Sequence, residues 1–410
     1  MQSCAARLVV VVLGLAGLAG AVPGGGLVRD AQGQVIVRTV GGRGASGTTL
    51  ITTRSVDEYA KLLGLTAEQH ETVKTLHEGY RAAWKAADEE RESKQEAAQE
   101  KMQDGDFEAM SKAISETMDA FAEKTTKLEA QFMEDMKTTL TAEQMDKWPA
   151  VERHRRRDTR LRAATFSGAN VDLIRVVART QSDPGTSEFS QLLSEYEMAV
   201  DRQIVENTSR LSSVPRPDDN QGFDPKHQDE LMKVMGENGK ALRELHRGFA
   251  RRLAGLMTEE GRARFEADVA KRSFPQVYET THVEDCLTAA SGFSDLDASA
   301  KETVRQLQEQ WQRESVALNK SWADAISKAE EDAGGSMALQ IQQMTGGGGN
   351  TEIKAAREAR RELEKRLRSR LDEVLTSAQE ERLPAKKKSD AGPMGGLRIN
   401  IGGGSAEDEE

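Results

Sequence analysis

An all-α fold is predicted for this chain of 410 residues, arranged as three tandem, diverged helical-hairpin units with long amphipathic, coiled-coil-like helices. Three observations predict it. Charged residues make up 30% of the chain and aromatic residues only 4%, a composition that is typical of long, surface-rich helices. Apolar residues recur at helical spacing, and no strand pattern occurs beyond an N-terminal leader. Three short sequence anchors also recur in the same order.

The first 21 residues have the features of a secretory signal peptide. Arg7 precedes an apolar run from Leu8 to Leu18, and Ala19-Gly20-Ala21 supplies an A-x-A cleavage site. This run is shorter than the roughly 20 residues that a membrane-spanning helix needs. We therefore expect an exported protein, periplasmic or secreted after cleavage near Ala21, with no transmembrane span in the mature chain.

Two terminal segments lack any helical period. Residues 22–54 form a glycine-rich leader, and residues 386–410 combine lysines, glycines and an acidic end. Such compositions are typical of flexible chain, so we expect both segments to be disordered. The whole chain has a formal net charge of -11, which disfavours nucleic acid as a partner.

The anchors divide the intervening chain into helical units at 55–165, 166–280 and 281–385. The first anchor is a polar residue, a valine and an acid, the second is an aromatic residue, and the third is a threonine after an apolar residue. In chain order these are Val56, Val171 and Val283, then Tyr80, Tyr196 and Trp311, then Thr141, Thr258 and Thr376. Because the separations within each set are nearly equal, we expect three copies of one unit.

Each unit is predicted to hold a short helix, two long helices joined by a turn, and a final short helix. The turns are expected at residues 104–106, 214–225 and 346–350, where glycine, proline and aspartate gather. In the second unit, Gly236, Gly239 and Gly248 fall within a long helix. Each costs about 1 kcal/mol relative to alanine, so this helix is expected to be the least stable.

A five-residue element, LTxxQ, occurs at the start of several predicted helices. Threonine at a helix N-cap accepts a hydrogen bond from the amide three residues on, and glutamine at that position reaches back to the N-cap amide. At Thr258 the glutamine is replaced by Gly261, which leaves a plain cap. The capping positions are Leu65, Thr66 and Gln69; Leu140, Thr141 and Gln144; Thr258; and Leu375, Thr376 and Gln379.

In an exported, helical and charge-rich chain, this element resembles the LTxxQ (Spy/CpxP-like) family of bacterial envelope stress proteins. The resemblance implies a helical-hairpin cradle that binds unfolded or misfolded proteins, or modulates stress signalling, in the periplasm. It covers residues 65–161, where two copies of the motif stand at a hairpin-like distance.

The densest basic run is a possible binding patch. It would contact an acidic client, an anionic lipid surface or another subunit of a homo-oligomer. The alternative is that its arginines pair with the acidic residues of neighbouring helices. The residues of this basic run are Arg153, Arg155, Arg156, Arg157 and Arg160.

Two pairings that involve histidine have the spacing to supply metal ligands from one helix face. His70 and His77 lie seven residues apart and share a helix face, but two ligands are too few for a site, and a solvated polar face is the simpler interpretation. His282 and Cys286 have i, i+4 spacing, yet Cys286 stands among apolar positions, which favours a buried structural thiol. No metal site is assigned.

No sequence motif of an enzyme active site or cofactor site was found, so we expect a non-enzymatic protein without a cofactor. Three functions remain open. The first is a chaperone-like or stress-response protein that binds unfolded polypeptides or envelope proteins, and the second is a structural or scaffolding envelope protein. The third is a metal-binding stress sensor.

Overall fold

Helices form nearly all of the regular structure in a computed structural model of the chain, and the predicted all-α fold is confirmed. The structure describes residues 28–29, 35–36, 49–103, 107–161, 165–215, 225–344 and 350–386. The predicted signal peptide, the C-terminal tail beyond residue 386 and most residues of the three predicted turns lie outside these ranges. Within them, no helix is both long and apolar enough to cross a membrane.

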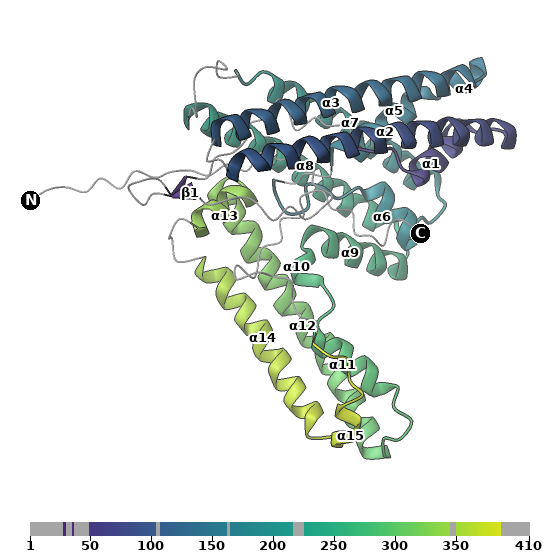
Figure 1. The fold of residues 1–410 in the computed structure, drawn as a ribbon. Helices are drawn as coiled ribbons and strands as arrows, with labels where there is room; N and C mark the ends of the chain where they lie inside the picture. The colour runs from purple at the N-terminus through teal and green to yellow at the C-terminus, as the bar shows by residue number, and fades with distance from the viewer. Residues whose placement is uncertain are drawn as a thin grey trace, which may run out of the picture. The chain divides into compact units, whose positions relative to one another are not determined.

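The chain divides into two compact units between residues 163 and 164, and each is described by itself (Figure 1). The first unit carries the only strands of the described residues, β1 (Val28–Arg29) and β2 (Val35–Ile36), which pair antiparallel with Val28 opposite Ile36. Its helices are α1 (Thr53–Leu63), α2 (Ala67–Gln103), α3 (Phe107–Thr138), α4 (Ala142–Met145) and α5 (Trp148–Arg160).

Helices α2 and α3 of the first unit pack along each other, and α1 packs on α2 and α5. Their shared core contains the buried residues Val73, Tyr80, Phe132, Met136 and Trp148. Apolar positions recur every three or four residues on both long helices, so one stripe of each faces the other. Helices α2 and α3 therefore form a helical hairpin.

The folded part of the first unit begins before residue 55, where the sequence predicts that the first helical unit starts. Ile51 is fully buried, and its backbone amide donates to the hydroxyl of Tyr80 at 3.3 Å. Nε2 of His77 donates to the carbonyl of Ile51 at 2.8 Å. Thr52 then caps α1, which ends at Gly64 in the left-handed conformation, with φ of 66°.

The second unit contains two long helix pairs. The helices are α6 (Leu173–Thr180), α7 (Ser187–Ser212), α8 (Pro225–Leu256), α9 (Glu259–Ser273), α10 (Pro275–Tyr278), α11 (His282–Ser291), α12 (Ala298–Ala333), α13 (Ser336–Met344), α14 (Thr351–Asp372) and α15 (Ser377–Glu380). Helix α7 packs on α8, and α12 packs on α14. The predicted units 166–280 and 281–385 therefore lie within one compact unit.

One helix break in the second unit was not predicted. Helix α12 ends at Ala333, and Gly334 and Gly335 follow with φ of 84° and 138°, before α13 begins. Positive φ angles are readily adopted only by glycine. The glycine pair therefore ends α12 before the turn that the sequence predicts at residues 346–350.

The first sequence anchor does not mark equivalent positions, which corrects the predicted alignment. Val56 lies four residues after the cap of α1 at Thr52, whereas Val171 precedes the cap of α6 at Asp172. Val283 lies within α11, which is capped by Thr281. Thr52, Asp172 and Thr281, and not the valines, each stand at the start of a short helix.

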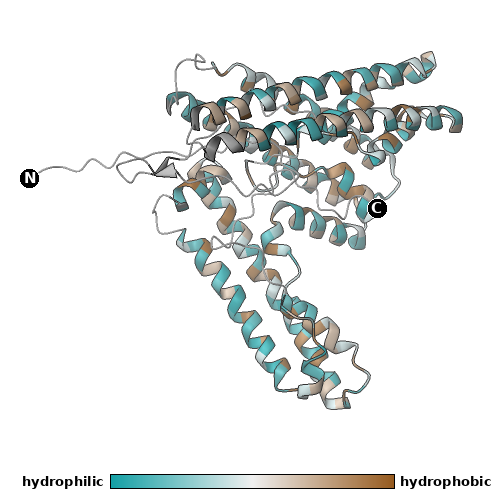
Figure 2. Cartoon of the chain, viewed as in Figure 1, coloured by the Kyte–Doolittle hydropathy of each residue, from teal (hydrophilic) through white to brown (hydrophobic). Residues whose placement is uncertain are grey.

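Hydrophilic residues cover most of the length of the long helices, as Figure 2 shows. Among the described residues, the exposed large hydrophobic side chains are scattered over α1, α4, α7 and α12. They are Leu62, Met145, Met198, Val205, Leu211 and Val316.

Candidate functional site

The strongest candidate site lies in the second unit, where residues 165–169 meet α8 and the break between α12 and α13. The hydroxyl of Thr165 donates to the carbonyl of Met235 at 2.9 Å. The amide of Ser336, at the start of α13, donates to the carbonyl of Thr165 at 2.7 Å. Thr165 therefore ties the middle of α8 to the first turn of α13.

Glycines allow the backbones at this junction to approach closely. A Cβ on Gly236 would collide with the carbonyl oxygen of Gly334, and a Cβ on Gly239 would collide with the hydroxyl of Thr165. Gly248 has no such neighbour within 4 Å. The sequence predicts that all three glycines destabilise α8, but packing requires two of them, Gly236 and Gly239.

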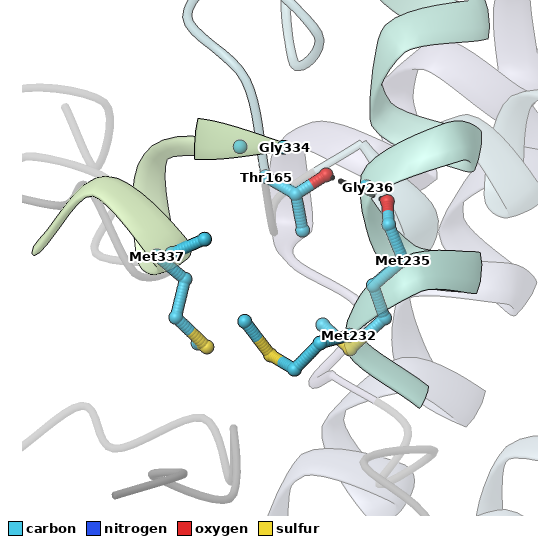
Figure 3. A pocket seen from close by; sticks show the side chains of 8 residues that line it. Thr165, Met232, Met235, Gly236, Gly334 and Met337 are labelled. Carbon is cyan, nitrogen blue, oxygen red and sulfur yellow. Dashed lines mark hydrogen bonds between the residues drawn. The ribbon is translucent and has the colours of Figure 1, made fainter. Parts of the chain in front are cut away.

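A small surface pocket opens beside this contact and is lined by three methionines, as Figure 3 shows. Met232 and Met235 lie three residues apart on α8, so they share a helix face. Met337 is the second residue of α13. Each of the three is partly exposed, and their thioether ends turn toward the pocket (Figure 3). The remaining lining comes from Thr165, Ala338 and the glycine backbones.

A buried group of charges lies next to the same loop. Glu330 of α12 is only 2% exposed and accepts hydrogen bonds from the amide of Ser167 at 2.9 Å and from its hydroxyl at 2.7 Å. Burial raises the pKa of this carboxyl, although the bonds from Ser167 and the charge of Arg243 act in the opposite direction. These bonds fix the loop to α12.

Arg243 of α8 provides the second charged link to α12. Its side chain is fully buried, it bonds Glu331 at 2.6 Å, and its guanidinium stacks over Phe166 with 4.7 Å to the ring centroid. Glu331 is 46% exposed, but the guanidinium is buried, so loss of Glu331 would leave a buried charge without that partner, which is costly. The backbone next to the methionine pocket is therefore held in place by hydrogen bonds and an ion pair.

The LTxxQ elements of the first unit form a different kind of structure. Thr66 and Gln69 bond each other reciprocally at 3.0 and 3.2 Å, as do Thr141 and Gln144 at 3.0 and 3.3 Å. The two glutamines also meet, and the carboxamide of each donates to the other at 2.9 Å. This mutual contact joins two capping boxes and is not apparent from either motif alone.

The other two helix pairs lack this double glutamine contact. Thr258 caps α9 and accepts from the amide of Gly261 at 3.2 Å, and Thr186 caps α7 with Phe189 at the third position. In the last pair, Gln379 donates to the carbonyl of Asp295 at 3.3 Å and accepts from the amide of Thr376 at 3.0 Å. The LTxxQ positions act in helix capping and in docking the short helices.

The basic run is not a single exposed patch. Arg155 and Arg157 are 6% and 4% exposed, and Arg155 bonds Glu129 of α3 at 2.5 and 2.9 Å. Arg153 and Arg156 are partly exposed, and Arg160 is exposed. The prediction of one binding surface is wrong for the two buried arginines, because their face of α5 packs into the unit.

The side chains of the two candidate metal pairings contact other protein groups. His70 bonds Asp57 at 2.9 Å, whereas His77 is buried beside Tyr80 and Phe132. Cys286 is a buried free thiol that accepts from Arg368 at 2.9 Å. Within the described ranges, no group of three or more His, Cys, Asp or Glu side chains is placed to hold an ion.

Comparisons with known proteins found no match among family models, curated proteins or solved structures.

The methionine pocket was missed because its parts lie far apart in the sequence. Met232 and Met235 come from the long helix α8 and Met337 from the short helix α13. One sequence signal was present, since Gly236 and Gly239 lie in a helix interior and Gly334 and Gly335 are adjacent. Small residues at such positions allow two backbones to come close.

Proposed function

We propose that this chain is a non-enzymatic exported protein that acts as a helical scaffold outside the cytoplasm. One observation carries the proposal: the helix pairs enclose their apolar side chains in their own seams. In the first pair these include Tyr80 and Phe132, and in the last pair Leu307, Leu363 and Leu367. Such closed seams leave a mainly charged surface.

Ion pairs on that surface also bridge the paired helices. Lys124 of α3 bonds Glu90 of α2 at 2.9 Å, and Arg366 of α14 bonds Glu314 of α12 at 2.5 Å. Individual exposed ion pairs contribute little to stability. Their placement along both seams supports the view that charge sets the register of each pair and keeps the scaffold in solution.

The proposal includes a repeated architecture of three diverged hairpin units. Its support is the position of the helix caps. Thr52, Asp172 and Thr281 each cap a short first helix, and a later helix of each segment, α4, α9 or α15, follows a cap at Thr141, Thr258 or Thr376. Repeating one supersecondary unit is a general route to an extended structural protein.

A chaperone-like protein is the second candidate, and one surface feature favours it. Met198 and Val205 lie seven residues apart on one face of α7 and are 48% and 51% exposed. The flexible side chain of Met198 suits varied polypeptide clients, and Val205 extends the apolar surface beside it. The resemblance of the Leu65 and Leu140 elements to the LTxxQ family of envelope stress proteins points in the same direction.

Aggregation of a chemically denatured client protein separates the two candidates. The scaffold function predicts that residues 22–410, at stoichiometric amounts and without ATP, leave the aggregation rate of several clients unchanged. It also predicts weak binding of an apolar fluorescent dye to the native protein. Clear suppression that is lost in a Met198→Ser, Val205→Ser double variant would overturn the scaffold in favour of the chaperone-like function.

A further inference from the structure

We propose that the pocket formed by Met232, Met235 and Met337 binds a single soft monovalent metal ion, Cu(I) or its analogue Ag(I). Three thioether groups from two helices turn toward one small pocket (Figure 3). Thioether sulfur is a soft ligand that selects Cu(I) over hard cations. Three such donors supply a neutral, all-sulfur ligand set.

The pocket holds no competing hard ligand among its lining side chains. Thr165 is the only one with an oxygen, and its hydroxyl already donates to the carbonyl of Met235. No carboxylate or imidazole lines the pocket, although divalent zinc, calcium and magnesium depend on such groups. The lining therefore favours a soft monovalent ion over the common divalent ions.

Backbone contacts hold the two helices that carry the methionine ligands, and the ligands themselves stay accessible. Thr165 bonds the backbone of both α8 and α13, and Gly236 meets the backbone of Gly334. These contacts fix the backbone positions from which the three methionine side chains extend. Their partial exposure lets an ion enter without opening the core, and the flexible side chains then adjust to it.

Anaerobic titration with Cu(I), in competition with a coloured Cu(I) chelator, tests the site in the full chain. We expect one Cu(I) ion per chain. Met337→Leu keeps the side-chain volume and should weaken binding by at least about tenfold, a loss that even disturbing the partner of a ligand typically causes. Met198→Leu is the matched control because Met198 is exposed on α7, outside the pocket, and it should leave binding unchanged.

Two further measurements test whether the thiol binds the ion and whether the variant is folded. Cys286→Ala should retain binding, since the thiol is buried elsewhere in the unit. Thermal unfolding followed by circular dichroism should show that Met337→Leu is folded and that Ag(I) raises the Tm of the parent but not of this variant. The proposal is overturned if the parent binds no Cu(I), if Met337→Leu binds as the parent does, or if Cys286→Ala abolishes binding.

Discussion

Gln69 and Gln144 use every hydrogen-bonding position of their side-chain amides on one another and on nearby backbone. Each Nε2 donates to the other glutamine, and the second donor of each reaches the carbonyl of Thr139 or of Gly64. Gln144 is only 8% exposed, so its bonds are sheltered from water. Fully satisfied polar networks of this kind stabilise a fold, whereas half-satisfied networks do not.

The two single replacements of these glutamines should therefore together lower the free energy of unfolding by more than the double replacement does. Gln144→Leu leaves an amide position of Gln69 and the carbonyl of Gly64 unpaired, and we expect a loss of about 2 kcal/mol in the free energy of unfolding. A double-mutant cycle with Gln69→Leu should give a coupling of about 1 kcal/mol in urea unfolding. Gln131→Leu, at an exposed site, is the control, and additive effects would mean that the two amides act independently.

The N-cap at Thr141 can be tested separately from the glutamines. Thr141→Ala removes the acceptor for the amide of Gln144 and should cost about 1 kcal/mol of stability. Thr126 is exposed within α3, where alanine is the better helix former, so Thr126→Ala should be neutral or slightly stabilising. Chemical unfolding of both variants checks this, and an unchanged stability in Thr141→Ala would show that the cap contributes nothing.

Gly236→Ala and Gly248→Ala should change the stability in opposite directions, although both residues lie in α8. Alanine is preferred over glycine in a helix interior by about 1 kcal/mol, so Gly248→Ala should raise the stability by that order. Gly236→Ala should lower it, because the new methyl group would meet the carbonyl of Gly334. Thermal melts of the two variants are compared directly, and stabilisation by both would mean that the backbones do not touch in solution.

Arg155 should behave as an interior residue and not as part of a binding surface. Arg155→Met leaves Glu129 without its partner, and the loss of stability should be about 3 kcal/mol. The exposed Arg160 provides the control, since Arg160→Met should change stability by less than about 0.5 kcal/mol. Equal effects of the two substitutions on unfolding would contradict the buried ion pair.

His246 should make the stability of the second unit fall as the solution is acidified. Burial lowers its pKa to about 4, below the value of about 6.5 of an unfolded histidine. The unfolded chain therefore binds a proton between these values when the folded chain does not, so stability present above pH 6.5 is lost as the pH falls toward 4. The full loss is on the order of 3 kcal/mol.

Urea unfolding at several pH values checks this dependence. His246→Gln should flatten the slope between pH 6.5 and 4 relative to the parent. Tyr196→Phe removes the hydroxyl that lies 3.1 Å from Nδ1 of His246 but keeps the histidine, so it should lower stability at all pH values and preserve the slope. A parent slope that survives in His246→Gln would assign the effect to other groups.

Helical periodicity and caps could be predicted from the sequence because both depend on neighbours within a few residues. The stripes around Tyr80 and Leu363 and the capping role of Thr141 are local signals of this kind. The anchor valines misled the alignment, since an apolar residue beside a polar one occurs at many points of an amphipathic helix. The contact of Gly236 with Gly334 and the meeting of Gln69 with Gln144 depend on tertiary approach, which no local pattern specifies.

The glutamine contact also constrains how such a chain can diverge. In the second helix pair, the residues three positions after the two N-caps are Phe189 and Gly261. In the last pair they are Ala300 and Gln379, and the side-chain amide of Gln379 donates to Asp295. A lone glutamine requires a substitute acceptor, whereas a double replacement requires none. Substitution at one of these positions therefore limits which residues the other can tolerate, so the two sites are expected to change in step.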